Sequence, residues 1–201
     1  MTLAASYETP LFSYAARMLG GLGDGERCLV TALTIGWRDL DGSAEPSQPK
    51  TWLYTVVREG CFDELARRAP ATTGEDDLAG LDGCVAAAAD SALTAVRPAH
   101  RDLLLLRDVH GLDTAALSDV TDMAEADLEH QLFRARAEFA RVFAELPADP
   151  RCRASRERAG CPDCAERERL RSMPQNALLQ LGPLPVRERV RADLRRALSD
   201  G

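Results

Sequence analysis

Apolar side chains recur every three or four residues along most of this chain, which is the spacing of one face of an α-helix. The clearest faces near the start are Tyr7, Leu11, Tyr14 and Met18; Leu29, Leu33, Gly36 and Trp37; and Leu53, Val56, Val57, Gly60, Cys61 and Leu65. The breaker-rich stretch 42–49 separates the second face from the third. No stretch alternates apolar and polar residues as a half-buried strand does, so the sequence predicts an all-α protein.

Residues 71–90 interrupt this helical spacing. They are small, acidic and glycine-containing, with room for a short helix at 84–89, and they predict a linker. Helical spacing returns afterwards. The pattern therefore predicts a domain at 1–70, a second domain at 91–147 and a Cys-containing basic C-terminal tail at 148–201.

The second domain carries start and stop signals for three helices. Pro98 suits the first turn of a helix through the leucine run that follows, and Gly111 suits its end. Asp113 or Thr114 can cap a short helix, and a longer apolar face runs from Leu128 to Val142. A short helix, a tight turn and a longer helix make a helix-turn-helix, although two helices packed in an ordinary bundle give the same pattern.

Three sets of residues between about 7 and 143 resemble those of a known family in order and spacing. They are Asp24-Gly25-Glu26 followed by Trp37-Arg38; Lys50-Thr51-Trp52-Leu53-Tyr54 followed by Arg58 and 63–68; and Ala92-Leu93, Val96-Arg97-Pro98 and 101–112 followed by Leu128 and 132–136. The first two sets resemble region 2, and the third resembles region 4, of extracytoplasmic function (ECF) sigma factors of the sigma-70 family.

This resemblance implies a bacterial transcription initiation factor that binds core RNA polymerase and promoter DNA, with an anti-sigma or other regulatory protein as a further candidate partner. In the family, region 2 grips the polymerase clamp and opens the −10 element, while region 4 reads the −35 element. The implied polymerase contacts are Leu29, Val30, Leu33 and Trp37. The implied DNA contacts are Lys50, Trp52 and Arg58 at the −10 element, and His130, Gln131, Arg134 and Arg136 at the −35 element.

The helix expected to read the −35 element, which is the recognition helix of the helix-turn-helix, carries more acidic residues than a DNA-binding helix should. Seven acidic residues and three arginines lie between Asp113 and Arg141, and carboxylates repel the phosphates that supply most non-specific affinity for DNA. The arginines, which can contact phosphates or pair with Asp127, Glu129 or Glu138, are Arg134, Arg136 and Arg141. In addition, Glu59 stands where the family commonly has an asparagine. The alternative is therefore a sigma-like adaptor that binds polymerase or another regulator without promoter recognition.

Charge divides the chain into unlike segments. Residues 71–150 carry sixteen acidic and six basic side chains, a net of −10, whereas 151–201 carry seven acidic and twelve basic ones, a net of +5. Opposite charges attract, so the tail is expected to dock on the acidic segment and to act as a built-in inhibitor or a partner-binding arm.

The tail also contains three of the six cysteines, and it loosely resembles a zinc-binding anti-sigma domain. The spacing of Cys161 and Cys164 lets two thiolates share one zinc ion, and Cys152 is a third candidate ligand. A closed zinc site needs four ligands, which leaves Glu157 or a group elsewhere to complete it. A redox pair and a pair that is merely packed or exposed remain alternatives. The other cysteines, which we expect to be small core residues, are Cys28, Cys61 and Cys84.

The remaining observations concern location and catalysis. The first residues lack a basic stretch followed by an apolar one, and no apolar run is long enough to span a bilayer, so we expect a cytoplasmic protein. The three histidines have no neighbouring Ser or Cys in a nucleophile–base motif, and the glycines at 20–23 lack the lysine of a phosphate loop. An enzyme is therefore not expected.

Overall fold

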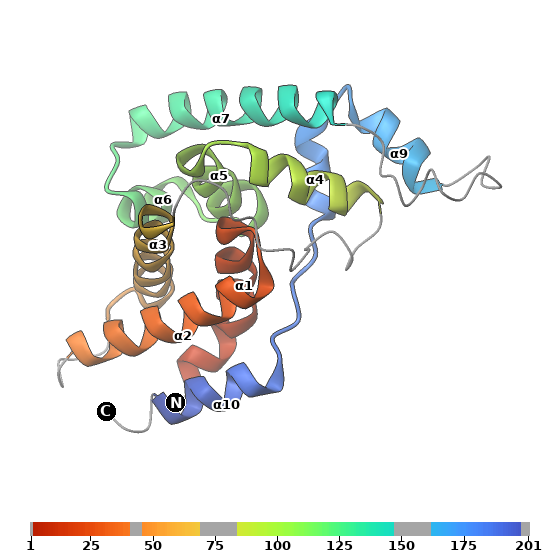
Figure 1. The fold of residues 1–201 in the computed structure, drawn as a ribbon. Helices are drawn as coiled ribbons and strands as arrows, with labels where there is room; N and C mark the ends of the chain where they lie inside the picture. Colours follow the sequence, from red (N-terminus) through yellow and green to blue (C-terminus); the bar gives the residue numbers. More distant parts are fainter. Residues whose placement is uncertain (1, 41–45, 69–83, 147–161, 198–201) are drawn as a thin grey trace.

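The computed structural model describes residues 2–40, 46–68, 84–146 and 162–197 of the 201-residue chain. Within those ranges every regular element is helical, which confirms the predicted all-α class (Figure 1). None of the helices in these four ranges combines the length and the apolar character needed to cross a lipid bilayer.

The first group of helices consists of α1 (Thr2–Leu19), α2 (Leu22–Asp39) and α3 (Pro49–Arg67). These three helices pack pairwise on one another, as their predicted apolar faces require. Gly20 makes the turn between α1 and α2 with φ +76°, a conformation that suits glycine. Gly25 lets the two helices approach closely, because a β-carbon there would lie 2.6 Å from the backbone of Ala16.

The second group consists of α4 (Cys84–Ala95), α5 (Pro98–Leu104), the π-helical turn η2 (Leu105–Val109), α6 (Thr114–Thr121) and α7 (Glu125–Glu145). Its boundary residues agree with the sequence signals. Pro98 is the first residue of α5, and Gly111 has φ +66° after η2. Of the two candidate caps for α6, Asp113 is the one whose side chain accepts the backbone N–H of Ala116, at 2.8 Å.

Helix α4 changes the expected role of the linker. The helix begins at Cys84 and buries Val85 and the alanines at 86–89 in the core. The last residues of the predicted linker therefore pack as part of the second group, while 71–83 lie outside the described residues.

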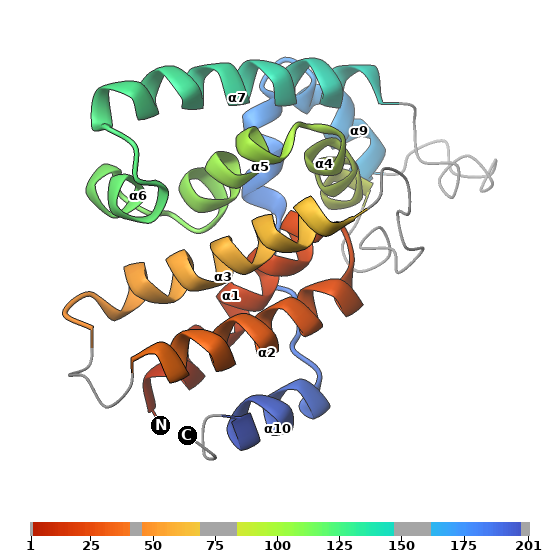
Figure 2. The ribbon, with the colours of Figure 1, turned by 60° about the vertical axis from the view of Figure 1, so that its left-hand side comes forward.

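The two groups share one continuous apolar core. Helix α1 lies against α4, α5 and η2, and α3 lies against α6 (Figure 2). Buried side chains of both groups, among them Leu11, Leu93 and Leu104, belong to the same cluster. The two groups therefore form one folded body.

The C-terminal segment runs back from the second group to the first. Its elements are α9 (Pro162–Leu170), the 3-10 helix η3 (Pro174–Gln180) and α10 (Glu188–Ala197). Helices α9 and η3 pack on α4, η3 also packs on α7, and α10 packs on α2 (Figures 1 and 2). Leu178, Leu184 and Val190 are buried along this path, so the segment belongs to the same core.

Candidate functional site

The turn between α6 and α7 has the form of a helix-turn-helix. Asp122 has a left-handed conformation (φ 55°) directly after α6, and the Ser118 hydroxyl donates to the Met123 carbonyl at 2.6 Å. Leu117 before the turn and Leu128 after it are both buried. The predicted short helix, turn and longer helix are therefore present, and α7 is held with one face outward.

The outward face of α7 carries the residues predicted for the −35 element. His130, Arg134 and Arg136 are exposed on it, and Gln131 is half-buried beside them. Phe133 is 73 % exposed on the same helix, which is unusual for a large aromatic side chain. Sequence periodicity gave no reason to single out Phe133.

The arginines of this face differ in their partners. Arg136 donates from Nε and Nη2 to the two carboxylate oxygens of Asp108, at 2.9 and 2.5 Å, and these bonds raise the pKa of Arg136. Arg141 pairs with Glu145 at 2.9 Å. No carboxylate among the described residues lies within ion-pairing distance of Arg134. Arg134 is therefore the cation of α7 best placed for a phosphate or a base edge.

None of these arginines pairs with the acids suggested by the sequence, Asp127, Glu129 and Glu138, all of which lie in the described part of the chain. Glu138 is occupied by the second group itself: it accepts from Arg97 Nε at 2.9 Å and lies against His100 Nδ1. Burial acts to raise the pKa of Glu138, but His100 and Arg97 outweigh it, and the pKa is lowered. Arg136 thus finds its partner on η2 and Glu138 finds its partners at the start of α5, whereas Arg141 pairs within α7 with an acid other than those suggested.

A buried carboxylate joins the two helix groups. Asp102, on α5, is 1 % exposed and accepts hydrogen bonds from the Tyr14 hydroxyl of α1 and from Arg58 Nε of α3, each at 2.7 Å. Burial raises the pKa of Asp102, while Arg58 and Tyr14 oppose that shift by stabilising the ionised form. Burial and the Asp102 charge raise the pKa of Tyr14, so the phenol keeps the proton that it donates.

Arg58, predicted at the −10 element, is occupied by this network. Its guanidinium lies 4.9 Å from the centroid of the Phe62 ring, and Nη1 donates to the Val120 carbonyl of α6 at 3.5 Å. In this arrangement Arg58 joins α3 to the second group and is not available to DNA. The sequence could not show this, since Asp102 is forty-four residues away.

A cavity of about 430 Å³ opens beside Asp102. It brings together three of the predicted DNA-binding residues, Arg58, Gln131 and Arg134. Arg97 also lines it, so the cavity wall carries three guanidinium groups against one buried carboxylate. The fold thus places parts of the two predicted DNA sites next to each other.

The other two residues predicted at the −10 element lie in the first half of α3. Lys50 is half-buried in the first turn of that helix and has no ion-pair partner among the described residues. Trp52 packs edge-on against Trp37 of α2, with ring centroids 6.4 Å apart and an interplanar angle of 64°. Trp52 therefore supports the packing of α3 on α2, and Lys50 is the freer of the two.

The predicted polymerase contacts on α2 do not all reach the surface. Leu29 and Leu33 are 0 % and 3 % exposed, because they belong to the face that packs on α1 and α3. Val30 and Trp37 are half-buried at the edge of that face. The exposed side chains of α2 are Arg27, Thr31, Ile35, Arg38 and Asp39. The helical register of the buried leucines could have identified this face from the sequence.

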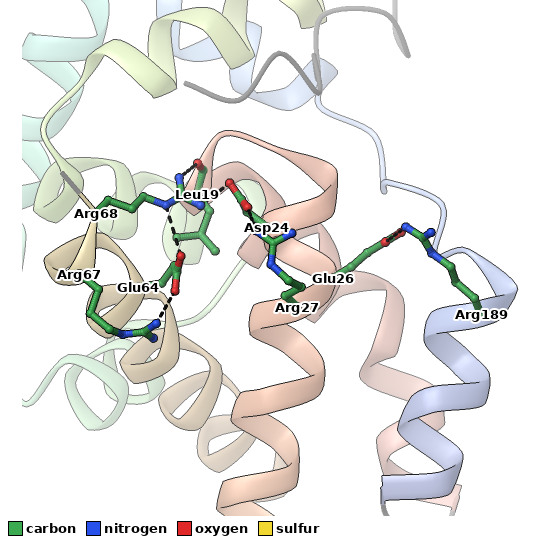
Figure 3. A network of polar contacts seen from close by, with 8 residues as sticks. All are labelled: Leu19, Asp24, Glu26, Arg27, Glu64, Arg67, Arg68 and Arg189. Carbon is green, nitrogen blue, oxygen red and sulfur yellow. Dashed lines mark hydrogen bonds and ion pairs between the residues drawn. The ribbon is translucent and has the colours of Figure 1, made fainter. Parts of the chain in front are cut away.

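Helix α10 lies beside this face of α2 and is joined to it by ion pairs. Glu26 of α2 accepts a hydrogen bond from Arg189 at 2.5 Å (Figure 3) and forms an ion pair with Arg187 at 3.4 Å, and Arg191 pairs with Glu8 of α1 at 2.9 Å. The tail was expected to dock on the acidic segment 71–150; α9 and η3 do pack on α4, and η3 on α7, within that segment, whereas these ion pairs join α10 to the first helix group. The carboxylates that hold α10 belong to the first helix group.

The predicted zinc site falls largely outside the described residues. Cys152, Cys161 and Glu157 all lie there, whereas Cys164 is half-buried on α9. In the part of the chain that the structure describes, no three His, Cys, Asp or Glu side chains come together as a ligand set. Zinc binding by the tail therefore stays a prediction. Cys28 and Cys61 are buried, as expected of core residues, and Cys84 is half-buried.

His110 is a half-buried titratable group that the sequence did not single out. Its ring packs against those of Tyr14 and Tyr54, with centroids 6.0 and 5.6 Å away, and its Nε2 has no hydrogen-bond partner among the described residues. Burial, together with the charges of Arg17 and Lys50, lowers the pKa of His110 to about 3. The ring is therefore neutral at physiological pH.

No family model matches this chain. It is 26 % identical over 171 residues to the ECF RNA polymerase sigma factor SigG of Mycobacterium tuberculosis, in each of the strains CDC 1551 / Oshkosh and ATCC 25618 / H37Rv. The match covers 68 % of this chain and 46 % of the relative, so the chain spans about half the length of the curated relatives it matches. This similarity supports a distant relationship to ECF sigma factors.

Asp102→Asn should destabilise the protein by about 2–3 kcal/mol, because the amide leaves the partly buried charge of Arg58 without a counter-charge. The free energy of unfolding in urea measures this. Glu145→Gln, which removes an ion pair exposed to solvent, is the control and should cost less than about 0.5 kcal/mol. Equal costs for the two variants would contradict the central role of Asp102.

Acid should destabilise the protein partly through His110. The unfolded chain binds a proton at this histidine near its ordinary pKa of 6.5, whereas the folded chain does so only near pH 3, so stability falls as the pH drops through this window. His110 then accounts for a loss of about 2 kcal/mol between neutral pH and pH 5. His110→Phe should remove that part of the loss in urea unfolding, whereas exposed His130→Asn should not. Parallel pH profiles for wild type and His110→Phe would refute the assignment.

Proposed function

We propose that this chain is a sigma-type transcription initiation factor that binds core RNA polymerase and directs it to promoters. One observation carries the proposal: a three-helix group and a helix-turn-helix group follow one another in the order of sigma regions 2 and 4, in a chain with distant similarity to a named ECF sigma factor. No step of this role calls for a catalytic residue in the chain, since the chain contributes binding surfaces only.

The −35 element would be read by the outward face of α7. The Arg134 guanidinium, which pairs with no carboxylate in the described part of the chain, could make a bidentate contact with guanine or bind a phosphate, and His130 and Gln131 lie near it in the helix. Arg136 would first have to leave Asp108, so its contribution depends on exchange of that ion pair. The proposal therefore ranks Arg134 above Arg136.

The −10 element would be contacted by α3. Lys50, at the start of the helix, is available in the described arrangement. Arg58 could reach DNA only if α3 separated from α5 and α6, because Asp102 and Val120 now accept its hydrogen bonds. Trp52 would likewise have to leave its packing against Trp37. Opening of the two helix groups is therefore part of the proposed function.

Core polymerase would bind the outward face of α2, with Thr31 and Ile35 at its centre. Ile35 is 54 % exposed, a large apolar side chain of the kind that protein interfaces bury. Val30 and Trp37, which the family resemblance implies as polymerase contacts, flank this face. Leu29 and Leu33 would act only indirectly, by fixing α2 in the core.

The C-terminal segment would restrict access to this polymerase surface. Helix α10 lies along α2, and Val190 and Asp193 line a cavity together with Val30 and Thr31. The Glu26 ion pairs hold α10 at this position. The described arrangement would then be a resting state, from which polymerase or another partner displaces α10.

The second candidate function is a sigma-like adaptor, which binds polymerase or a regulatory protein without reading a promoter. The acidic side chains Glu125, Asp127 and Glu129 favour it, because all three are exposed on α7 and would face the phosphates of a bound duplex. Both candidates share the polymerase surface on α2, and they differ in whether α7 binds DNA.

Charge reversal on α10 tests the tail. The variant Arg187→Glu/Arg189→Glu/Arg191→Glu should co-elute with core RNA polymerase on gel filtration in larger yield than wild type, because it repels Glu26 and Glu8. The control Arg169→Glu/Arg171→Glu/Arg196→Glu alters arginines whose described pairs lie within their own helix or beside it, and should behave like wild type. If none of the three proteins binds polymerase, the proposed function fails; equal binding by all three contradicts only the role of α10.

Arg134→Ala tests promoter binding against the adaptor function. DNA fragments enriched from a genomic library by polymerase plus wild-type chain would serve as the probe in gel shifts. Arg134→Ala should weaken binding about tenfold, whereas Arg141→Ala, which removes an arginine already paired with Glu145, should change it less than twofold. Polymerase binding without any enrichment of DNA would favour the adaptor.

A further inference from the structure

Two cysteine thiols meet between α2 and α3. The sulfurs of Cys28 on α2 and Cys61 on α3 lie 3.5 Å apart, within hydrogen-bonding distance, and both residues are buried. Neither residue has a part in the surfaces proposed above, and neither thiol belongs to the CxxC motif of the tail. Thirty-three positions separate them in the sequence, so their meeting depends on the fold.

Small residues make this close approach possible. A β-carbon at Gly60 would lie 2.9 Å from the Ala32 β-carbon and 3.4 Å from the Cys28 sulfur, so α2 and α3 could not pack this tightly with a larger residue at position 60. A disulfide requires its sulfurs at about 2.05 Å. The pair therefore has to close by about 1.5 Å, which is within the range of small side-chain rotations.

The thiol pair is reachable from one side. Cys28 lines a groove of about 250 Å³ between α2 and α3, whereas Cys61 does not line it. The rim carries Asp24, Arg27, Glu64 and Arg67, shown with their ion pairs in Figure 3. A small, polar reagent can thus reach the Cys28 sulfur first.

The two thiols differ in acidity, and Cys28, the thiol that the groove exposes, is the more acidic one. The hydrogen bond with Cys61 lowers the pKa of Cys28, and Arg67 and Arg68 act the same way, against burial and Glu64. The same hydrogen bond, followed by burial, raises the pKa of Cys61. Either sulfur can donate in this hydrogen bond. When Cys61 donates, Cys28 is the thiol that more readily becomes a nucleophilic thiolate.

We propose that Cys28 and Cys61 form an oxidant-responsive dithiol, which a hydroperoxide converts into a disulfide between α2 and α3. The Cys28 thiolate attacks the peroxide, whose O–O bond breaks, to give a sulfenic acid and a hydroxide or alkoxide ion, which takes up the proton released by Cys28 and leaves as water or an alcohol. The Cys61 sulfur then attacks the sulfenic sulfur; the S–S bond forms, the S–O bond breaks, and the hydroxide leaves with the Cys61 proton as water. Two thiols lose two electrons in total, and one peroxide gains them.

The disulfide would join the two helices at a fixed distance and close a chain segment of about thirty residues. Such a cross-link restricts the unfolded chain and should raise the melting temperature by roughly 5–15 °C. This inference concerns the thiols alone and holds whether or not the chain acts on promoters.

The test uses the full-length chain with Cys84, Cys152, Cys161 and Cys164 replaced by Ser, so that only the proposed pair can react. One equivalent of hydrogen peroxide should remove both thiols, lower the mass by 2 Da and link the two cysteine-containing peptides, and dithiothreitol should reverse all three changes. In the same background, Cys61→Ser should accumulate oxygen on Cys28, a gain of 16 or 32 Da. Cys28→Ser should react at least tenfold more slowly than the parent. Circular dichroism confirms that each variant is folded, and Cys→Ala replaces any that is not.

Two results would overturn the proposal. The first is a folded parent whose thiols stay unreactive toward ten equivalents of hydrogen peroxide. The second is oxidation that stops at a gain of oxygen on Cys28, or that links two chains, with Cys61 still reduced. Faster oxidation of Cys28→Ser than of Cys61→Ser would overturn the assigned roles of the two thiols.

Discussion

The described structure depends on one buried carboxylate. Asp102 has lost nearly all contact with water, and a charge in that position is tolerable only because Tyr14 and Arg58 donate to it from two other helices. The three helices belong to both halves of the chain, so these two hydrogen bonds also determine how the halves sit together. Any movement of α3 away from α5 must rehydrate Asp102, protonate it or give it a new donor.

Arg101, the residue before Asp102, fixes the ends of two helices by hydrogen bonds. Its guanidinium donates to the Met18 carbonyl at the end of α1 and to the carbonyls of Leu93 and Val96 at the end of α4, at distances of 2.6 to 3.2 Å. Helix ends leave carbonyls without partners, and a buried arginine can satisfy several of them at once. Burial lowers the pKa of Arg101 to about 10, which still leaves it charged at neutral pH. Two consecutive residues of α5 thus fix α1, α3 and α4.

Much of the fold could be predicted from the sequence, because helix periodicity and caps are local properties. The all-α class and the boundary residues Pro98, Gly111 and Asp113 all follow from such signals. The candidate site was less predictable, since the availability of a charged side chain depends on partners far away in the chain. Arg58 and Arg136 look like DNA contacts in the sequence, yet one is bound to Asp102 and the other to Asp108. The family resemblance guided the assignment of surfaces but could not reveal these intramolecular pairs.

The route of the C-terminal segment has a consequence for the order in which the protein is made. The backbone N–H of Leu184 donates to the Ser13 hydroxyl at 2.7 Å, across 171 positions of sequence, and α10 then lies on α2. A ribosome adds roughly 5–20 residues per second, so it makes α10 seconds after α7. Helices α1 to α7 can therefore assemble while α10 is still within the ribosome. During synthesis, α2 therefore stays uncovered for seconds before α10 can reach it.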